Sequence, residues 1–426
     1  MTALAVLLLA GAALLGAPLF AVIGAAALLG FASEGVSAAA VVIELYRMTD
    51  APALLAIPFF TFAGYLMAEA RTPQRLTHLA RAALGWMPGG LAAVTLATCA
   101  FFTAFTGASG ATIVALGGLL YASLLRDGYP QRFSLGLVTS SGGLGLLFAP
   151  SLPLILYGVV AQVNIDHLFL AGIAPGLLLL VILAVYSMRT GGRAAPRTPF
   201  SAPALARALR ESAWELPLPV LILGGIYGGF YTAAEAAAVT AFYVLAAEVF
   251  VYRDLDLWRD VPRIARESMI LVGVILVILG AALGLTNYLV DQQVPQKLLA
   301  AMKALIVNRW VFLLALNLFL LAVGCMMDIF SAIVVVTPLI LPIARDFGVH
   351  PVHLAVIFLA NLEIGYTTPP VGLNLFIAAN RFRVSLTEVW RASVPFLWWR
   401  LLALALITYL PEITLAPLRW LLRGGF

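Results

Sequence analysis

Long apolar segments, separated by short polar or basic connections, follow one another along almost the whole chain. Many of them run for about eighteen residues or more with few charges, which predicts membrane-spanning helices. Strands are not favoured, because these runs of Leu, Ala, Val and Gly lack the alternation of a membrane β-barrel. We therefore expect an all-α polytopic membrane protein. The pattern predicts nine full crossings, at residues 3–31, 53–70, 133–163, 167–188, 214–230, 232–252, 267–289, 352–380 and 391–416.

The composition and the placement of basic residues support this class and indicate an orientation. Of the 426 residues, 63% are hydrophobic and 11% are charged, whereas soluble domains carry about 25% charged residues. If the N-terminus is cytoplasmic, seventeen basic residues lie in cytoplasmic connections and seven on the opposite side. This asymmetry follows the positive-inside rule, so we expect a cytoplasmic N-terminus and an external C-terminus. It also explains the net charge of +5 without a nucleic-acid partner.

Polar or helix-breaking residues interrupt four of the apolar segments near their middles. Segments 90–125 and 310–345 each carry a polar tip, which predicts two re-entrant helical hairpins. Segments 133–163 and 352–380 each carry Gly, Pro and hydroxyl residues at the centre, which predicts two broken helices. Unpaired backbone groups cost several kcal/mol each in lipid, so such breaks persist only where protein or a water-filled cavity shelters them.

A shift of 219 positions places the first half of the chain on the second. Under it, Arg126 falls on Arg345 and Pro150 falls on Pro369. Each copy then holds two spans, an amphipathic arm, a hairpin, a broken span and a closing span, and the unmatched crossing at 214–230 reverses the second copy. Such an inverted repeat is typical of secondary transporters, and its matching breaks indicate their binding site. The expected units are a first repeat, a basic cytoplasmic linker with the reversing crossing, and a second repeat, at residues 1–188, 189–231 and 232–426.

The interruptions are the expected binding sites because they free polar groups inside the membrane. Carbonyl oxygens at helix C-terminal ends, with hydroxyls nearby, suit Na⁺, and facing half-helix N-termini suit a carboxylate. Asp328 and Glu363 are the ionisable residues that the pattern places nearest the midplane, where such residues usually have a function. The alternatives stay open: Asp328 could cap a hairpin helix, Glu363 could pair structurally, and hydroxyls can bond to their own helix.

An enzyme or a metal protein is not expected. The chain lacks HExxH, GxSxG and any His–carboxylate cluster within a span, so no catalytic motif is present. His350 and His353 lie in a short connection without a third ligand, so no transition-metal site is predicted. A channel is a further alternative, which saturable, ion-coupled uptake would exclude.

Together these residues resemble the large membrane subunit of tripartite ATP-independent periplasmic (TRAP) transporters, of DctM type. The resemblance covers essentially the full chain and is most specific at TTPPVGLNLF (367–376), GASG (107–110), APSLPLILYG (149–158) and YTAAEAAAV (231–239). It implies an elevator-type secondary symporter in a bacterial or archaeal inner membrane. Such a protein imports a carboxylate-bearing solute, such as a C4-dicarboxylate or a sugar acid, and is typically driven by Na⁺.

The resemblance also implies partners. A periplasmic binding protein would deliver the solute, and a separate, small four-helix membrane subunit would pair with this chain in the bilayer. The nearest alternative is a one-component, ion-coupled dicarboxylate symporter of similar architecture. Transport that needs no binding protein would favour that alternative.

Site residues follow from the matching motifs. In the first half, the resemblance implies Na⁺ binding by Thr106, Ser109, Ser140, Ser141 and Gly145. In the second half it implies Na⁺ binding by Gly324, Asp328, Gly365, Thr367 and Thr368. The expected substrate-binding residues are Pro150, Ser151, Pro369 and Asn374, and Asp328 or Glu363 could couple transport to protons.

Two features depart from this pattern or narrow it. The first hairpin tip reads GASGAT, whereas many relatives have a more serine-rich tip, so the first ion site departs from the family's pattern at this tip. Arg400 falls within the last span, and no lone buried arginine is evident that could clamp a carboxylate. Anion binding is therefore expected to rest on helix ends and hydroxyls.

Overall fold

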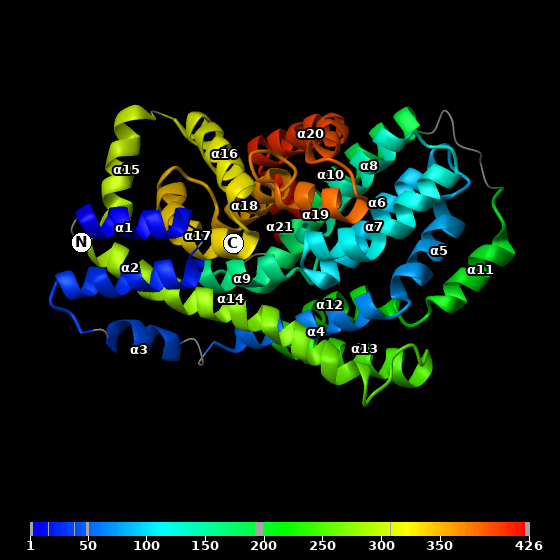
Figure 1. Ribbon diagram of the computed structural model, residues 1–426, viewed down its shortest axis with the longest axis horizontal. Coiled ribbons are helices and arrows are strands. Elements are labelled where there is room, and N and C mark those ends of the chain that lie inside the picture. Colours follow the sequence, from blue (N-terminus) through cyan, green and yellow to red (C-terminus); the bar gives the residue numbers. More distant parts are fainter. Residues whose placement is uncertain are drawn as a thin grey trace.

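The computed structural model describes residues 3–15, 17–37, 39–47, 51–191, 199–306 and 308–421. Every regular element within these ranges is a helix (Figure 1). Part of the predicted basic linker, residues 192–198, lies outside them. The first half contains α1 (Ala3–Leu14), α2 (Leu19–Ser33), α3 (Ala39–Arg47), η2 (Pro52–Leu55), α4 (Ala56–Glu69), α5 (Thr72–Leu84), α6 (Gly90–Thr106), α7 (Ser109–Arg126), α8 (Gln131–Ser141), η3 (Leu144–Leu147), α9 (Leu152–Ala161) and α10 (Ile165–Gly191).

The second half contains a similar series after two connecting helices. Eight helices among the described residues are long and apolar enough to cross a membrane, and the bent pair Gln131–Leu147 and Leu152–Ala161 makes a ninth if it counts as one span. This confirms the prediction of a polytopic helical protein. The elements are α11 (Ala202–Glu211), α12 (Pro217–Tyr227), α13 (Ala233–Ala246), the π-helix η4 (Ala247–Val251), α14 (Asp260–Asp291), α15 (Val294–Leu305), α16 (Arg309–Met326), α17 (Ile329–Asp346), α18 (Pro351–Gly365), α19 (Leu373–Phe382), α20 (Leu386–Tyr409) and α21 (Glu412–Leu421).

The four predicted interruptions are real breaks in the helices. The hairpin segments form the helix pairs α6–α7 and α16–α17. Gly107, with φ of +64°, ends α6 in the left-handed conformation that a residue without Cβ adopts most easily. In the first broken segment the two parts are bent by 44°. In the second, α18 ends at Gly365 and α19 begins at Leu373, and a proline in the gap has no N–H to continue the ladder.

Three predicted crossings differ in the structure. The segment 3–31 is divided into α1 and α2, because Pro18 begins α2 and cannot donate to a continuing helix. The segment 391–416 is likewise divided, since α20 ends at Tyr409 and α21 follows Pro411. At 214–230 the structure has only α12, with 11 residues. A straight helix of that length is shorter than the roughly 20 residues that a full crossing takes.

Helices from the two halves contact one another reciprocally. α7 and α17 begin at Ser109 and Ile329 and end at Arg126 and Asp346, so both bounds are 220 positions apart. The turns that follow them hold Gly128 and Gly348, with φ of +80° and +73°, at the same spacing. The spacing of these elements is 220 positions, one more than the shift of 219 that was found in the sequence. α7 packs on α19 while its counterpart α17 packs on α9, and α2 packs on α14 while α13 packs on α4 (Figure 1).

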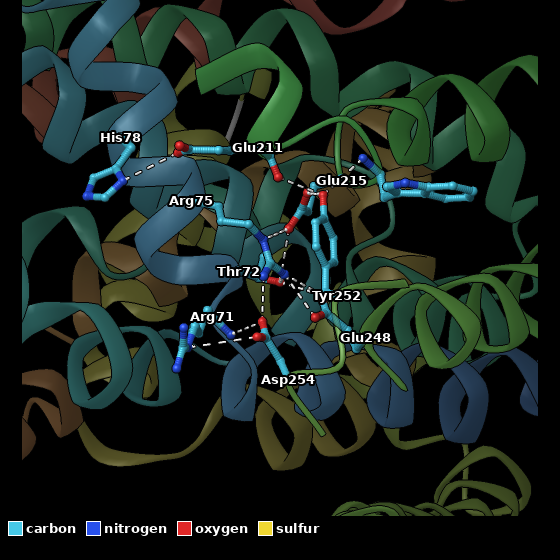
Figure 2. A network of polar contacts seen from close by, with 10 residues as sticks. Arg71, Thr72, Arg75, His78, Glu211, Glu215, Glu248, Tyr252 and Asp254 are labelled. Carbon is cyan, nitrogen blue, oxygen red and sulfur yellow. Dashed lines mark hydrogen bonds and ion pairs between the residues drawn. The ribbon is translucent and has the colours of Figure 1, made fainter. Parts of the chain in front are cut away.

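The arm helix α5, which leads into the first hairpin, is held by a buried ionic network. Figure 2 shows Arg75 surrounded by Glu215, Glu248 and Asp254, which come from the segments flanking α12 and α13. Arg75 Nη2 donates to both oxygens of Glu248, at 2.8 and 2.9 Å, while Nε donates to Glu215 and Nη1 to Asp254. The Arg75 and Glu248 side chains are 11% and 2% exposed. The guanidinium of Arg75 therefore links α5 to the segment before α12 and to the segment after α13.

The surroundings of Arg75 keep it charged. Burial opposes the charge of the guanidinium, but the nearby carboxylates of Glu248 and Glu215 outweigh burial and hold the pKa of Arg75 above its ordinary value. The Tyr252 ring lies over the guanidinium, 3.7 Å from its central carbon to the ring centroid, which adds a cation–π contact. Burial, followed by the hydrogen bond to Glu215, raises the pKa of Tyr252, so this phenol stays neutral.

Candidate functional site

One cavity of about 300 Å³ lies where the interruptions of both halves meet. Residues 107–110 of the first hairpin tip and 328–330 of the second tip line it, together with Leu146 and Tyr366 from the two broken helices. An apolar face of α14 forms the remaining wall. Segments that are far apart in the sequence thus converge on a single space. Among the predicted site residues, Ser109 and Asp328 line this cavity directly.

In the first half, the end of α6 is joined to the break that follows α8. The Thr103 hydroxyl donates to the carbonyl oxygen of Gly142 at 2.7 Å, and the hydroxyls of Thr103 and Thr112 are 2.7 Å apart. Gly145 lies so close to α6 that a Cβ atom built on it would be 2.3 Å from the carbonyl oxygen of Ala100. The predicted ligand Gly145 therefore marks a point where two backbones approach each other without an intervening side chain.

The hydroxyl residues predicted in the first half, for the ion and, at Ser151, for the substrate, are buried. Two of them lack partners among the described residues. The hydroxyl of Ser141 donates to the carbonyl oxygen of Val138 in its own helix at 3.1 Å. Among the described residues, Ser140 Oγ and Ser151 Oγ are buried without a hydrogen-bond partner. Thr106 is buried at the end of α6. Buried polar atoms are normally satisfied, so the two free hydroxyls are available to a bound ion or water molecule.

The second half repeats the close approach with a different set of contacts. A Cβ atom on Gly365 would be 2.5 Å from the carbonyl carbon of Gly324 in α16. The N–H of Gly372 donates to the carbonyl oxygen of Cys325 at 3.1 Å, which closes the segment between α18 and α19 against the hairpin. The hydroxyls of Thr367 and Thr368 both donate to the carbonyl oxygen of Ile364, at 3.0 Å. Thr367 and Thr368 therefore share the turn that ends α18 at Gly365, whereas the predicted ligands Gly324 and Asp328 lie in the hairpin.

Glu363 is paired with an arginine that the sequence analysis did not assign to the site. Arg400 Nη2 donates to Glu363 Oε1 at 2.9 Å, and the side chains of the two residues are 1% and 0% exposed. Arg400 is buried, but it is not a lone arginine, because Glu363 is its counter-ion. A basic residue inside an apolar span was the available signal. Its partner, in a different helix, could not be read from the pattern.

Asp328 was predicted either to cap a hairpin helix or to have a function in the membrane, and the structure shows it both as a cap and at the cavity. Its carboxylate caps α17 by accepting the N–H of Ser331 at 3.0 Å and the Ser331 hydroxyl. The same residue lines the cavity between the tips. A carboxylate that caps a helix retains further lone pairs, so capping leaves acceptor capacity that faces the cavity.

Three of the four predicted substrate residues are buried and one is exposed. Asn374 lies on α19, where its Oδ1 accepts the hydroxyl of Ser109 at 2.8 Å and its Nδ2 is buried without a partner among the described residues. An expected ion residue and an expected substrate residue are thus in direct contact, across 265 positions of sequence. Pro150 and Ser151 are buried in the first break, whereas Pro369 is exposed in the second.

Comparison with known proteins identifies the family. The model of the family described as "Tripartite ATP-independent periplasmic transporter, DctM component" matches residues 2–413. The chain belongs to the DctM family. This DctM chain is 37% identical over 400 residues to a "C4-dicarboxylate TRAP transporter large permease protein DctM" of Pseudomonas aeruginosa, and the match covers 93% of each protein. It is therefore a multi-pass large permease subunit of a TRAP transporter and not an enzyme.

Other relatives of this DctM chain differ in the solutes that their names give. It is 34% identical to the "Ectoine/5-hydroxyectoine TRAP transporter large permease protein UehC" of Ruegeria pomeroyi, over 85% of both chains. It is 36% identical to the "Isethionate TRAP transporter permease protein DctMQ" of Oleidesulfovibrio alaskensis, over 93% of this chain and 63% of that one. Membership of the family therefore does not determine the solute.

A solved structure supports the fold. The YdaH transporter of Alcanivorax borkumensis matches this DctM chain with a TM-score of 0.60, over 90% of this chain and 88% of that one. The two are 14% identical in sequence, so the likeness concerns the arrangement of the helices.

Proposed function

We propose that this DctM chain mediates Na⁺-coupled import of a small carboxylate-bearing solute. In this proposal a periplasmic binding protein delivers the solute and a separate four-helix membrane subunit pairs with this chain. The observation that carries the proposal is the cavity in which both hairpin tips and both broken helices meet. A bound solute would there contact elements from both halves. The named solutes of the C4-dicarboxylate and isethionate relatives are consistent with an anionic cargo.

The arrangement favours Na⁺ over a proton as the coupling ion. The proposed ligands are the ten residues named from the motifs, and in each half they include a glycine, Gly145 or Gly365, where two backbones approach closely. Oxygen atoms are the ligands that hard cations prefer. Of the two candidate proton carriers, Glu363 already has Arg400 as its counter-ion, which favours Asp328 as the fallback if Na⁺ is not required.

The solute is proposed to bind through helix ends. The N-termini of α7 and α17 lie at the two tips of the cavity, and helix N-termini attract anions. Asn374 adds an amide with unused donors beside Ser109. The Arg400 guanidinium is enclosed and engaged, so it is not proposed to contact the solute.

We also propose that the two halves form an inverted repeat that moves by an elevator mechanism. The units are the ranges 1–188, 189–231 and 232–426, and each hairpin is re-entrant. The reciprocal contacts α7 with α19 and α17 with α9 support a two-fold relation, since a simple translation of one half would not exchange the partners. Inversion in the inner membrane, with a cytoplasmic N-terminus and an external C-terminus, accounts for the distribution of basic residues.

Uptake into proteoliposomes tests the proposal. The vesicles would contain this chain and its small membrane subunit, with the binding protein outside and radiolabelled succinate, isethionate or ectoine as probes. We expect uptake that requires the binding protein and rises with an inward Na⁺ gradient. Uptake that ignores the Na⁺ gradient would contradict Na⁺ coupling. Uptake without the binding protein would favour a one-component symporter.

Replacement of Thr368 tests the second ion site in the same assay. Thr368→Val removes a hydroxyl while keeping the shape of the side chain, so a higher Na⁺ concentration should be needed for half-maximal uptake. Thr368→Ser, which keeps the hydroxyl, is the matched control and should titrate like the unmodified protein. An unchanged Na⁺ titration in Thr368→Val would remove Thr368 from the site.

A further inference from the structure

Arg400 contacts two residues, Glu363 and Thr367, that lie on either side of the end of α18. From the middle of α20, Nη2 donates to the carbonyl oxygen of Glu363 at 2.8 Å and to its carboxylate at 2.9 Å. Nη1 donates to the hydroxyl of Thr367 at 2.8 Å. Because the guanidinium is planar and rigid, these bonds fix the positions of the two residues relative to each other.

The turn held in this way is the one assigned to the second ion site. α18 ends at Gly365, between the two residues that Arg400 binds. The Thr367 hydroxyl accepts from Arg400 and donates to the carbonyl oxygen of Ile364, so its proton points back toward the helix. The bonds to Arg400 and to Ile364 together orient this hydroxyl.

Glu363 in turn connects Arg400 to the first half of the chain. The Glu363 side chain packs against Gly143 in the first broken segment, where a Cβ atom would be 2.5 Å from Glu363 Cγ. The acid is therefore enclosed between the guanidinium and the other break. A side chain confined from both sides cannot turn away, which holds the pair in a single geometry.

The first half has no equivalent of this charged pair. At a spacing of 219 or 220 positions, Arg400 corresponds to Val181 or Leu180 on α10. The break of the first half is instead joined to its hairpin by the hydroxyl of Thr103. The charged pair is thus a feature of the second ion site alone.

We propose that Arg400 is a positioning residue for the second ion site, holding the end of α18 and Thr367 in the geometry that binds Na⁺. The inference rests on the proposed Na⁺ coupling. Arg400 does not touch the ion. It acts through Thr367 and through the backbone of Glu363, and Glu363 serves as its fixed counter-ion.

The test measures Na⁺ binding without any solute. The full chain with its small membrane subunit would be placed in nanodiscs, and thermal unfolding would be followed while NaCl replaces choline chloride at constant ionic strength. A ligand that binds the folded state raises the melting temperature, so the titration gives the Na⁺ concentration at half-saturation. Arg400→Lys keeps the charge and loses the planar fork, and we expect it to raise that concentration about tenfold.

A double-mutant cycle shows whether Arg400 acts through Thr367. Thr367→Val should also raise the half-saturation concentration, and Thr367→Ser should restore it. Once Thr367 is Val, adding Arg400→Lys should shift the titration less than it does in the unmodified protein, because residues that act as one unit are not additive. The control is Ser393→Ala, since this buried serine on α20 donates only to Val389 in its own helix; its titration should be unchanged.

The possible failures are distinguishable. If Arg400→Lys lowers the melting temperature but leaves the half-saturation concentration unchanged, Arg400 is merely structural and the inference is overturned. If Arg400→Lys does not fold, the Thr367→Val variant provides the test, because Thr367→Val leaves the Arg400–Glu363 pair intact. A normal Na⁺ titration in Thr367→Val would then overturn the inference. If the unmodified complex shows no response to Na⁺, the proposed Na⁺ coupling fails and the inference fails with it.

Discussion

At the scale of single residues, each of the two proposed ion sites contains a glycine at a point where two backbones meet. Gly145 lies against Ala100 and Ala104 of α6, and Gly365 lies against Gly324 and Cys325 of α16. In each half the break in the broken helix thus touches the first helix of its hairpin without a side chain between them. This contact lets carbonyl groups from two segments approach the same point, which a cation site built from oxygens requires.

Gly145→Ala should therefore damage both stability and transport. The new Cβ would lie 2.4 Å from the Ala104 nitrogen, and such overpacking should lower the free energy of unfolding by about 1–3 kcal/mol. Thermal unfolding and Na⁺-driven uptake would measure the two effects. Gly273→Ala on α14 is the control, because nothing lies within 4 Å of its new Cβ. Wild-type uptake and stability in Gly145→Ala would show that the approach is unimportant.

At the scale of elements, the arm α5 differs from its counterpart α15. α5 is fixed by Arg75 and three carboxylates at a nearly buried position. α15 is joined by the exposed pair Lys303–Asp346. Exposed pairs contribute little to stability, whereas removal of one partner from a buried group leaves uncompensated charge. The arm that leads into the first hairpin is therefore the more firmly anchored of the two.

Replacing Arg75 should accordingly be costly. Arg75→Met leaves Glu215 and Glu248 without their cation and leaves Asp254 only the exposed Arg71. We expect a loss of about 3–5 kcal/mol in the free energy of unfolding. Arg75→Lys should lose less, because it keeps one charge but not the planar fork. Arg263→Met is the matched control: Arg263 pairs with Glu69 and Glu267 at an exposed position, so its replacement should destabilise the protein much less than Arg75→Met. Equal losses in Arg75→Met and Arg263→Met would contradict a special role for the network.

At the scale of the whole molecule, the reciprocal contacts between halves indicate how the cavity is formed. α7 of the first half packs on α19 of the second, and α17 of the second packs on α9 of the first. Each hairpin is thus supported by the broken helix of the other half. The cavity between the tips is lined by residues of both halves, which the proposed inverted repeat requires of its binding site.

The inversion can be tested by labelling single cysteines from each side of the membrane. Arg126 and Arg345 are exposed residues at the ends of α7 and α17. If the halves are inverted, an impermeant maleimide should label Arg126→Cys only from the cytoplasm and Arg345→Cys only from outside. Cys99 and Cys325 are buried, and the unmodified protein serves as the control. Labelling of both sites from the same side would refute the inversion.

The sequence by itself determined the class of the protein and the positions of its breaks. Apolar length is a local property that fixes which segments can cross a bilayer, and Gly and Pro act on the helix in which they stand. The outer bounds of the four interrupted segments were therefore predicted within one or two residues. The divisions at Pro18 and Pro411 could have been predicted by the same rule.

Only the tertiary structure decided which groups meet. Ser109 and Asn374 are 265 positions apart and Arg400 and Glu363 are 37 apart, and no periodic pattern relates the members of either pair. The partner of a buried charge is set by how helices pack, because the cost of burying it is offset only by a group brought to it in space. The sequence could therefore place Arg400 in a span, but its link to the second break came from the fold.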